Sequence, residues 1–225
     1  MNTNAPEICT MSKTILIAGA TGLIGNTTLL LALENPSISR VIALVREPLT
    51  LRHPKLEIWA NKDLLAALKQ DPVDAVICCL GTTIKKVGGN KQKFIHVDKD
   101  LVVSIARWAK ALQVPVFSVV SAIGANAKSR VFYNRVKGEM EQALKAIGFQ
   151  PLHIFQPSVL SGPRPESRLG ESIGIAGAKL LAPMLPANYK LMPHDVLARA
   201  ILRSVSEPLG GTHRYMAIVA LASRP

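Results

Sequence analysis

The 225-residue chain can bury one sizeable core, since 48% of its residues are hydrophobic, and a single domain is expected. It carries 27 Lys and Arg against 15 Asp and Glu, a formal net charge of +12 that attracts phosphate-bearing ligands, nucleic acid or anionic lipid surfaces. Only 4% of residues are aromatic, and no basic stretch is interleaved with them. Nucleic acid is therefore not an expected partner.

The cysteines, the histidines and the apolar segments narrow the class of protein further. Three cysteines, two of them adjacent, exclude a secreted disulfide framework and favour a reducing compartment. The five histidines lack metal-ligand spacing, so no metal is expected. The apolar stretch 173–185 is too short to span a bilayer, and no signal peptide is recognised, so no transmembrane segment is predicted. We predict a cytoplasmic protein with a disordered leader at 1–12, starting at Met1 or Met11.

Apolar runs and helical patterns alternate along the chain. Buried strands are predicted at 14–18, 41–45, 56–60, 75–80, 116–121 and 152–155. Helices are predicted at 23–33, 64–69, 97–112, 136–147 and 195–205. This alternation predicts an α/β fold with a doubly wound, mostly parallel sheet, the Rossmann fold, as a single domain over 13–225. Within it, 158–225 is rich in Gly and Pro at its start and is predicted to contribute a small C-terminal substrate-side lobe.

A glycine-rich turn joins the first predicted strand to the first helix. Glycine permits a tight turn and close approach to a pyrophosphate, and the helix N-terminus stabilises the anion. We therefore predict cofactor contacts at Gly19, Ala20, Thr21, Gly22, Leu23, Ile24 and Gly25. The alternative is a tight strand-to-helix connection without a ligand.

The residue after the second strand bears on cofactor choice. An Asp or Glu there usually binds the ribose hydroxyls of NAD, whereas an Arg accommodates a 2′-phosphate through paired hydrogen bonds. Arg46 is the first residue after this strand, so NADP(H) is preferred, with NAD(H) as the alternative cofactor. In the alternatives, Glu47 accepts the hydroxyls of NAD, or Arg46 is a solvated surface cation.

Further cofactor contacts are predicted at the end of the fourth strand, at Leu80, Gly81, Thr82 and Thr83. There Gly81 would let the backbone pass close to the cofactor, and Thr82 would bond a ribose or phosphate oxygen. Four lysines follow this segment. They either attract an anionic substrate to the site or belong to a solvated loop. They are Lys85, Lys86, Lys91 and Lys93.

A candidate reactive constellation comprises Ser121, Tyr133 and Lys137. Tyr133 and Lys137 are spaced i, i+4 at the start of a helix, and Ser121 ends the fifth strand twelve residues before Tyr133. Carbonyl reduction needs a hydride on carbon and a proton on oxygen. Lys137 would favour the phenolate of Tyr133 and hold the nicotinamide ribose, while Ser121 would hold the substrate oxygen. In the alternative, Tyr133 and Lys137 belong to an ordinary surface helix.

The order of these motifs resembles the short-chain dehydrogenases/reductases over most of the chain. The segments VVSAIGA, YNRVKGEME and QPSVLSGPR are most similar to atypical members related to Tat-interacting protein. The resemblance implies adenine contacts at Asp63 and Leu64, although Asp63 is equally well read as a helix N-cap. It also implies that Pro157, Ser158 and Val159 lie against the nicotinamide, with a plain turn as the alternative.

Two classes of function follow. The first is an NADP(H)-dependent oxidoreductase acting on a small carbonyl or hydroxyl compound, with isomerase or epimerase chemistry in the same class. The second is an NADPH-binding regulatory or interaction protein with little turnover, since such proteins occur among the relatives and the Asn-rich turn of classical members is absent after the fourth strand. The expected partners are a dinucleotide and a small-molecule substrate, and a homo-oligomer is compatible with the sequence.

Overall fold

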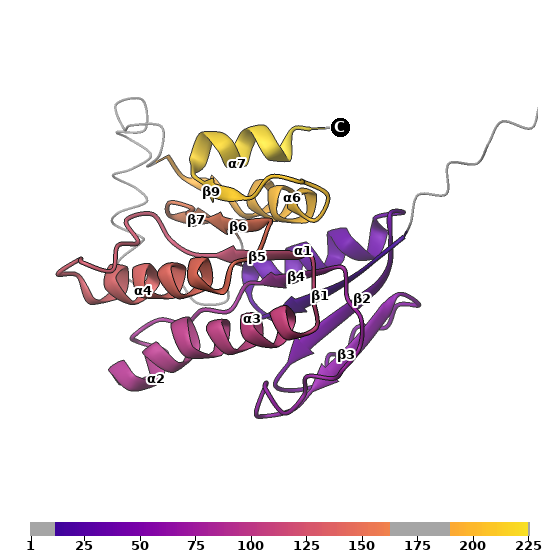
Figure 1. Cartoon of the computed structure of the whole chain (residues 1–225), viewed down its shortest axis with the longest axis horizontal. Helices are drawn as coiled ribbons and strands as arrows, with labels where there is room; N and C mark the ends of the chain where they lie inside the picture. Colours follow the sequence, from indigo (N-terminus) through magenta and orange to yellow (C-terminus); the bar gives the residue numbers. More distant parts are fainter. Residues whose placement is uncertain (1–11, 163–189, 225) are drawn as a thin grey trace, which may run out of the picture.

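The computed structural model describes residues 12–162 and 190–224, in which strands and helices alternate (Figure 1). The strands are β1 (Lys13–Ala18), β2 (Ile38–Val45), β3 (Leu56–Ala60), β4 (Ala75–Cys78), β5 (Val116–Val120), β6 (Leu152–Phe155), β7 (Leu160–Ser161), β8 (Met192–Pro193) and β9 (Gly211–His213). The helices are α1 (Leu23–Glu34), α2 (Lys91–Ile95), the π-helical turn η1 (His96–Asp100), α3 (Leu101–Ala111), α4 (Phe132–Ile147), α6 (His194–Ser204) and α7 (Tyr215–Ala222).

The main sheet of the described part has seven strands in the order β3-β2-β1-β4-β5-β6-β9. Every neighbouring pair is parallel. The strand order reverses between β1 and β4, and in such folds the ligand lies beyond the carboxyl ends of the strands at this point. A separate small sheet pairs β7 with β8. The predicted doubly wound Rossmann fold is confirmed.

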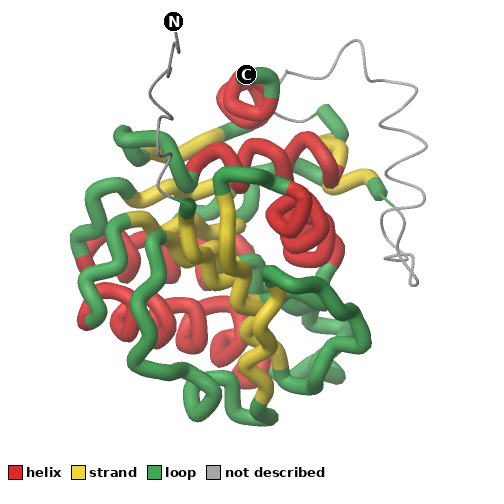
Figure 2. The backbone as a smooth tube through the Cα atoms, turned by 90° about the vertical axis from the view of Figure 1, so that its right-hand side faces the viewer, coloured by secondary structure: helices red, strands yellow, loops and turns green. Residues whose placement is uncertain are grey.

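Helices cover both faces of the sheet because its central strands are apolar on both sides. On β1, Ile15 and Ile17 pack in the same cluster as side chains from α1, α6 and α7. Leu16 and Ala18, which point the other way, pack with α3 and α4. Figures 1 and 2 show the sheet between these two helix layers.

The helix predicted at 64–69 is wrong. Residues 64–67 form turns, in which the N–H of Ala67 donates to the carbonyl of Leu64 at 3.3 Å. Leu64 is 6% exposed, whereas Leu65 is 36% exposed, so the segment buries one leucine rather than an apolar face. A short helix without a packed face is not stable enough to persist.

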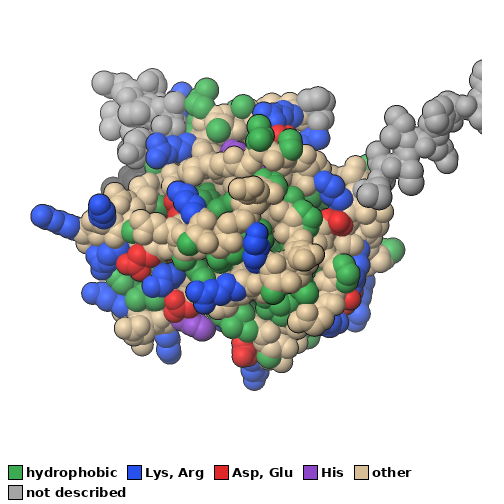
Figure 3. Space-filling view, viewed as in Figure 1, with side chains coloured by type: hydrophobic (Ala, Val, Ile, Leu, Met, Phe, Trp, Pro, Cys, Tyr) green, Lys and Arg blue, Asp and Glu red, His purple; other side chains and the backbone are tan. Residues whose placement is uncertain are grey.

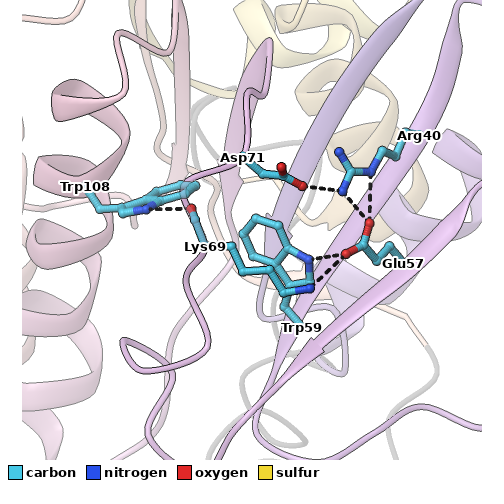
Figure 4. Close-up of polar contacts among 6 residues, drawn as sticks. All are labelled: Arg40, Glu57, Trp59, Lys69, Asp71 and Trp108. Atoms are coloured by element: carbon cyan, nitrogen blue, oxygen red, sulfur yellow. Dashed lines mark hydrogen bonds and ion pairs between the residues drawn. The ribbon is translucent and has the colours of Figure 1, made fainter.

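A polar cluster beside this segment ties β2 and β3 to the chain that leads to β4 (Figure 4). Glu57 accepts hydrogen bonds from Arg40 and from Trp59 Nε1, the latter at 2.6 Å, and Lys69 Nζ lies 3.1 Å from it. Arg40 also contacts Asp71 at 2.6 Å. Burial would raise the pKa of Glu57, but these hydrogen bonds outweigh it and lower that pKa to about 2.

The remaining differences concern element ends and the last strand. The helix predicted at 97–112 begins earlier, since α2, η1 and α3 follow one another without a break, and α4 begins at Phe132 rather than at 136. Strand β9 and helix α7 were not predicted. Part of 158–225 joins the main domain, because α6 packs on α1 and β9 pairs with β6. Residues 1–11 and 163–189, which hold most of the predicted leader and much of the predicted lobe, lie outside the described ranges.

Candidate functional site

The glycine turn between β1 and α1 is tightly packed against the end of β4. Gly19 has φ +83°, and a Cβ there would lie 2.9 Å from the carbonyl carbon and oxygen of Cys79. A Cβ on Gly25 would lie 2.1 Å from the Gly19 carbonyl oxygen. Both positions therefore require glycine.

The N-terminus of α1 suits an anion. Its N-cap is Gly22, so no capping side chain accepts from the first-turn N–H groups. A Cβ on Gly22 would contact only the Gly19 carbonyl oxygen, at 3.4 Å, so the turn is open there. This arrangement fits the pyrophosphate of a dinucleotide. The other predicted turn residues comprise two buried side chains (Ala20, Ile24), one half-buried (Leu23) and one exposed (Thr21).

The predicted adenosine-side residues occupy two neighbouring strand ends. Arg46 directly follows β2 and is exposed, as is Glu47. Asp63 is also exposed, and its Oδ1 accepts a hydrogen bond from the Leu65 N–H at 3.0 Å. Leu64 is buried in the core. The cofactor contacts assigned to these residues remain predictions.

The segment after β4 is joined to η1 through Asp98. The backbone N–H of Thr82 donates to Asp98 Oδ2 at 2.8 Å. A Cβ on Gly81 would lie 3.5 Å from Asp98 Oδ1 and 3.8 Å from Lys137 Nζ. Gly81 thus leaves the backbone close to a buried charged pair. Leu80 and Thr83 are half-buried.

Lys137 and Asp98 form that buried ion pair, with 2.8 Å between Nζ and Oδ1 and side chains that are 4% and 1% exposed. Burial by itself would lower the pKa of Lys137, but the charges of Asp98 and of Tyr133 raise it above its ordinary value. Lys137 is therefore an ammonium. Asp98 lies in the π-helical turn, a distortion that occurs frequently at functional sites.

Tyr133 lies in the first turn of α4 and is 36% exposed. Its ring packs against Phe94 with centroids 5.8 Å apart. Directly after Lys137, the helix approaches the loop that follows β5, and a Cβ on Gly138 would lie 2.1 Å from the backbone nitrogen of Ala127. Only glycine allows this approach, which sets the position of α4 and so of Tyr133 and Lys137.

Ser121 follows β5 and is 5% exposed. Its hydroxyl donates to Glu141 Oε1 at 2.5 Å. The amide nitrogen of Gln156, which follows β6, donates to both oxygens of Glu141 at 2.9 and 3.0 Å. Arg214 Nε in turn donates to Gln156 Oε1 at 3.1 Å. Ser121 therefore ends a polar chain that reaches to the residue after β9.

The turn after β6 is fixed from two sides. The carbonyl of Pro157 accepts from the Ile123 N–H at 2.9 Å, and the carbonyl of Val159 accepts from the Met192 N–H at 2.9 Å. Ser158 donates its hydroxyl to the Lys190 carbonyl. The turn thus lies beside the loop that carries Ser121, although its contact with nicotinamide remains a prediction.

Two acidic residues of the site, Asp98 and Glu141, were missed in the sequence. Asp98 carried a detectable signal, since it lies between the apolar Phe94 and Val102 at i, i+4, i+8. Glu141 carried a weaker one, since it shares a helix face with Lys137 at i+4. An acid on the buried face of a helix is rare unless it has a partner.

Metal chemistry and a membrane span find no support in the parts of the chain that are described. No group of three or more His, Cys, Asp or Glu side chains there is arranged to hold a metal ion. No helix there is long and apolar enough to cross a membrane. Burial raises the pKa of the Cys78 thiol to about 11, which opposes a role for it as a nucleophile.

The glycine turn, the buried lysine and the strand order define a dinucleotide-binding class of protein, and comparison with known families gives the same class. A family model described as NAD(P)H-binding matches residues 19–154, more than half of the chain. The chain belongs to this NAD(P)H-binding family.

Named relatives of the chain narrow the class of protein further. The chain is 31% identical to HTATIP2 of Rattus norvegicus over 207 residues, covering 89% of this chain and 84% of the relative. It is 34% identical to the mitochondrial protein fmp52 of Aspergillus fumigatus over 215 residues, covering 88% of each. It is 35% identical to the mitochondrial protein FMP52 of Eremothecium gossypii over 170 residues, covering 74% and 75%. The predicted relation to atypical short-chain dehydrogenases is confirmed.

Solved structures are similar in fold. WbmH of Bordetella bronchiseptica, in complex with NAD+, has a TM-score of 0.66 at 18% identity, covering 91% of this chain and 76% of that one. The ADP-L-glycero-D-manno-heptose-6-epimerase of Helicobacter pylori has a TM-score of 0.67 at 15% identity, covering 95% and 82%. At these identities the likeness extends to the fold alone.

One prediction is overturned by the relatives. The fungal proteins are named mitochondrial, which points to mitochondria rather than to the predicted cytoplasm. The cytoplasmic prediction rested on composition and on apolar patterns, neither of which distinguishes two compartments that both keep thiols reduced.

Proposed function

We propose that the protein is an NADP(H)-dependent oxidoreductase that acts on a small carbonyl or hydroxyl compound. The observation that carries the proposal is the buried Lys137 ammonium, held by Asp98 beside Gly81 and one helical turn from Tyr133. A buried cation is costly, and ionisable groups that are buried beside a cleft with a specific charge partner cluster at functional sites, which supports a chemical use for this one. From the names of the fungal relatives we also infer a mitochondrial location.

The residues divide the chemistry between them. NADPH, when bound, would supply the hydride for the carbonyl carbon. Tyr133 provides the proton for the carbonyl oxygen, and Lys137 stabilises the phenolate that remains. The turn at Gly19 and Gly22 would hold the pyrophosphate, and Arg46 would meet the 2′-phosphate.

A regulatory NADPH-binding protein is the second candidate. It is favoured by the same ion pair, because Lys137 bound to Asp98 at 2.8 Å also serves as a purely structural link between α4 and η1. This protein would bind the dinucleotide through the same turn and would show no turnover.

The experiment that separates the two candidates is Tyr133→Phe, which removes one hydroxyl and keeps the ring that packs on Phe94. We expect NADPH affinity and folding to be unchanged, while turnover of a substrate found in an aldehyde and ketone screen falls about 10²–10⁴-fold. NADPH oxidation at 340 nm measures turnover, and calorimetry measures affinity.

Lys137→Met is expected to differ from Tyr133→Phe by weakening NADPH binding as well as turnover, since Lys137 is assigned to the ribose and to the phenolate. Full turnover by Tyr133→Phe would refute the catalytic assignment. Tight NADPH binding by the wild type with no turnover in the screen would favour the regulatory candidate.

A further inference from the structure

Two segments meet at Tyr133, and both are rich in cations without an acid. Residues 81–97, which follow β4, and residues 121–138, which run from the end of β5 into α4, hold no Asp or Glu. Lys137 is buried against Asp98, whereas the other basic side chains of these segments are exposed or half-buried. They are Lys85, Lys86, Lys91, Lys93, Lys128, Arg130 and Arg135. The surface around Tyr133 is therefore positive, and neither segment supplies an acid to balance it.

An aromatic cluster joins the two segments. The ring of Phe94, from α2, is fully buried, and its centroid lies 5.5 Å from that of Phe132 and 5.8 Å from that of Tyr133. Lys91 Nζ lies 5.5 Å from the centroid of Phe132, and the guanidinium carbon of Arg135 lies 5.8 Å from it. A cation from α2 and one from α4 thus converge on a single ring, next to the proposed proton donor. Figure 3 shows Lys and Arg side chains gathered at this end of the molecule.

The two converging cations have no acid to neutralise them within the described residues. Lys91 forms no ion pair there, and the guanidinium of Arg135 donates to the Ser129 carbonyl at 3.1 Å. Glu139 lies four residues after Arg135, a spacing that allows an ion pair, but Lys99 binds it instead at 3.1 Å. An aromatic ring attracts a cation without cancelling its charge. The charges of Lys91 and Arg135 therefore remain available to an anion from outside the chain.

We propose that the substrate is an anionic carbonyl compound, whose carboxylate or phosphate is bound by Lys91 and Arg135 while its carbonyl lies at Tyr133. Phe132 adjoins Tyr133 in the first turn of α4, and Phe94 touches both rings, so the cations and the phenol border the same part of the surface. The anionic group is unchanged by the reaction: the hydride goes to the carbonyl carbon and the proton of Tyr133 to the carbonyl oxygen. The inference rests on the proposed oxidoreductase function and names its substrate class.

The test compares ω-oxo acids with their primary amides, which keep the aldehyde and the chain length but lack the charge. The acids are 4-oxobutanoate, 6-oxohexanoate, 9-oxononanoate and 12-oxododecanoate, so the distance from the carbonyl to the anion varies widely. Glyceraldehyde 3-phosphate, paired with glyceraldehyde, tests phosphate as the anionic group. We expect the wild type to prefer the anionic member of at least one pair by about 10–100-fold in kcat/KM, because hydrogen bonds to charged groups are the stronger ones.

Salt provides a second measure of the same preference. Raising the ionic strength from about 0.01 M to about 1 M shortens the Debye length from about 30 Å to about 3 Å. The ratio of kcat/KM within the preferred pair should therefore fall as salt is added. A ratio that does not change with salt would contradict recognition by the exposed cation Lys91.

Variants of the two cations and a matched control assign the preference. Lys91→Gln and Arg135→Gln should each reduce the ratio of kcat/KM within the preferred pair, and the double variant should bring it to within about twofold of one. Lys145→Gln removes an exposed lysine toward the other end of the same helix, and it should keep the wild-type ratio. NADPH affinity and thermal unfolding show whether each variant is folded, and the single variants decide the matter if the double variant is not.

Each outcome supports or overturns the inference. Equal kcat/KM within every wild-type pair overturns the substrate class. A preference that survives in the double variant, or that Lys145→Gln reduces as much as Lys91→Gln does, overturns the role of Lys91 and Arg135. If only neutral carbonyl compounds are turned over, and Tyr133→Phe abolishes that turnover, the oxidoreductase stands and this inference falls. If no carbonyl compound is turned over at all, both fall.

Discussion

At the scale of single residues, the ion pair between Asp98 and Lys137 links the stability of the fold to the candidate cofactor site. Asp98→Asn keeps an oxygen for the Thr82 N–H but removes the charge opposite Lys137. Removing one partner of a buried ion pair leaves an uncompensated charge, so we expect the free energy of unfolding to fall by about 3–5 kcal/mol. Urea denaturation measures it. As a control, Asp100→Asn, at an exposed position of the same turn, should lower the free energy of unfolding by less than about 0.5 kcal/mol. An Asp98→Asn protein as stable as the wild type would contradict the ion pair.

Arg46 governs the predicted preference for NADPH over NADH. Its guanidinium would form charge-assisted hydrogen bonds with a 2′-phosphate that NADH lacks. Arg46→Ala should therefore weaken NADPH binding by about 1.5–3 kcal/mol and leave NADH binding nearly unchanged. Calorimetric titration of both nucleotides decides the matter, with the exposed Arg52→Ala as control. Equal affinities of the wild type for both nucleotides would refute the assignment and favour the alternative in which Glu47 binds NAD.

The residues that sequence reasoning missed are those whose role depends on a neighbour far along the chain. Ser121 was recognised by its place after an apolar run, but its hydrogen-bond partner Glu141 comes 20 residues later. Gln156, which also bonds Glu141, comes 35 residues after Ser121. Spacing on a helix shows that Glu141 shares a face with Lys137. It does not show that a serine lies opposite, because that contact is created by sheet order.

At the scale of elements, histidines join the last two strands of the sheet. His153 on β6 and His213 on β9 are hydrogen-bonded between Nδ1 and Nε2 at 3.0 Å and are stacked with centroids 5.3 Å apart. Burial, aided by the charge of His213, lowers the pKa of His153 to about 4, although Glu207 opposes this shift. Burial likewise lowers the pKa of His213. Both rings are therefore held neutral in the folded state.

This pair predicts acid sensitivity. The ordinary pKa of histidine is about 6.5, so as pH falls below that value the unfolded chain takes up protons that folded His153 does not bind. Stability should be constant above pH 6.5 and lost progressively down to about pH 4, by up to about 3 kcal/mol for His153. Urea denaturation from pH 7.5 to 4.5 measures the slope. His153→Leu should reduce the slope of stability against pH, whereas His96→Gln, at an exposed histidine, should leave it unchanged. An unchanged slope in His153→Leu would contradict the assignment of the acid sensitivity to this residue.

Elements were predictable where local pattern and tertiary environment agree. The strands at 56–60 and 152–155 were predicted to the residue, because an apolar run between turn residues is what a buried parallel strand requires. The segment 64–69 has helical spacing but buries one leucine, so packing did not support a helix. Strand β9, Gly211–His213, has no apolar run at all. It is a strand only because β6 offers an edge for it.

At the scale of the whole molecule, charge and topology act together. Lys and Arg side chains are spread over the face shown in Figure 3 and gather over the end where α2 and α4 lie, in keeping with the net charge of +12. Such a surface raises the local concentration of a phosphate-bearing ligand. The composition predicted this attraction, but the place where the ligand binds follows from the reversal of strand order between β1 and β4.

The position of β9 has a consequence for synthesis on the ribosome. Its partner β6 ends at Phe155, and residues 156–210 must be translated before Gly211–His213 can pair with it. During that interval β6 is an open strand edge, which is the kind of surface that recruits other chains. Arg214, which orients Gln156, also emerges after β9. The edge of β6 therefore stays uncovered, and the polar chain to Ser121 stays incomplete, until the codons for Gly211–Arg214 have been translated.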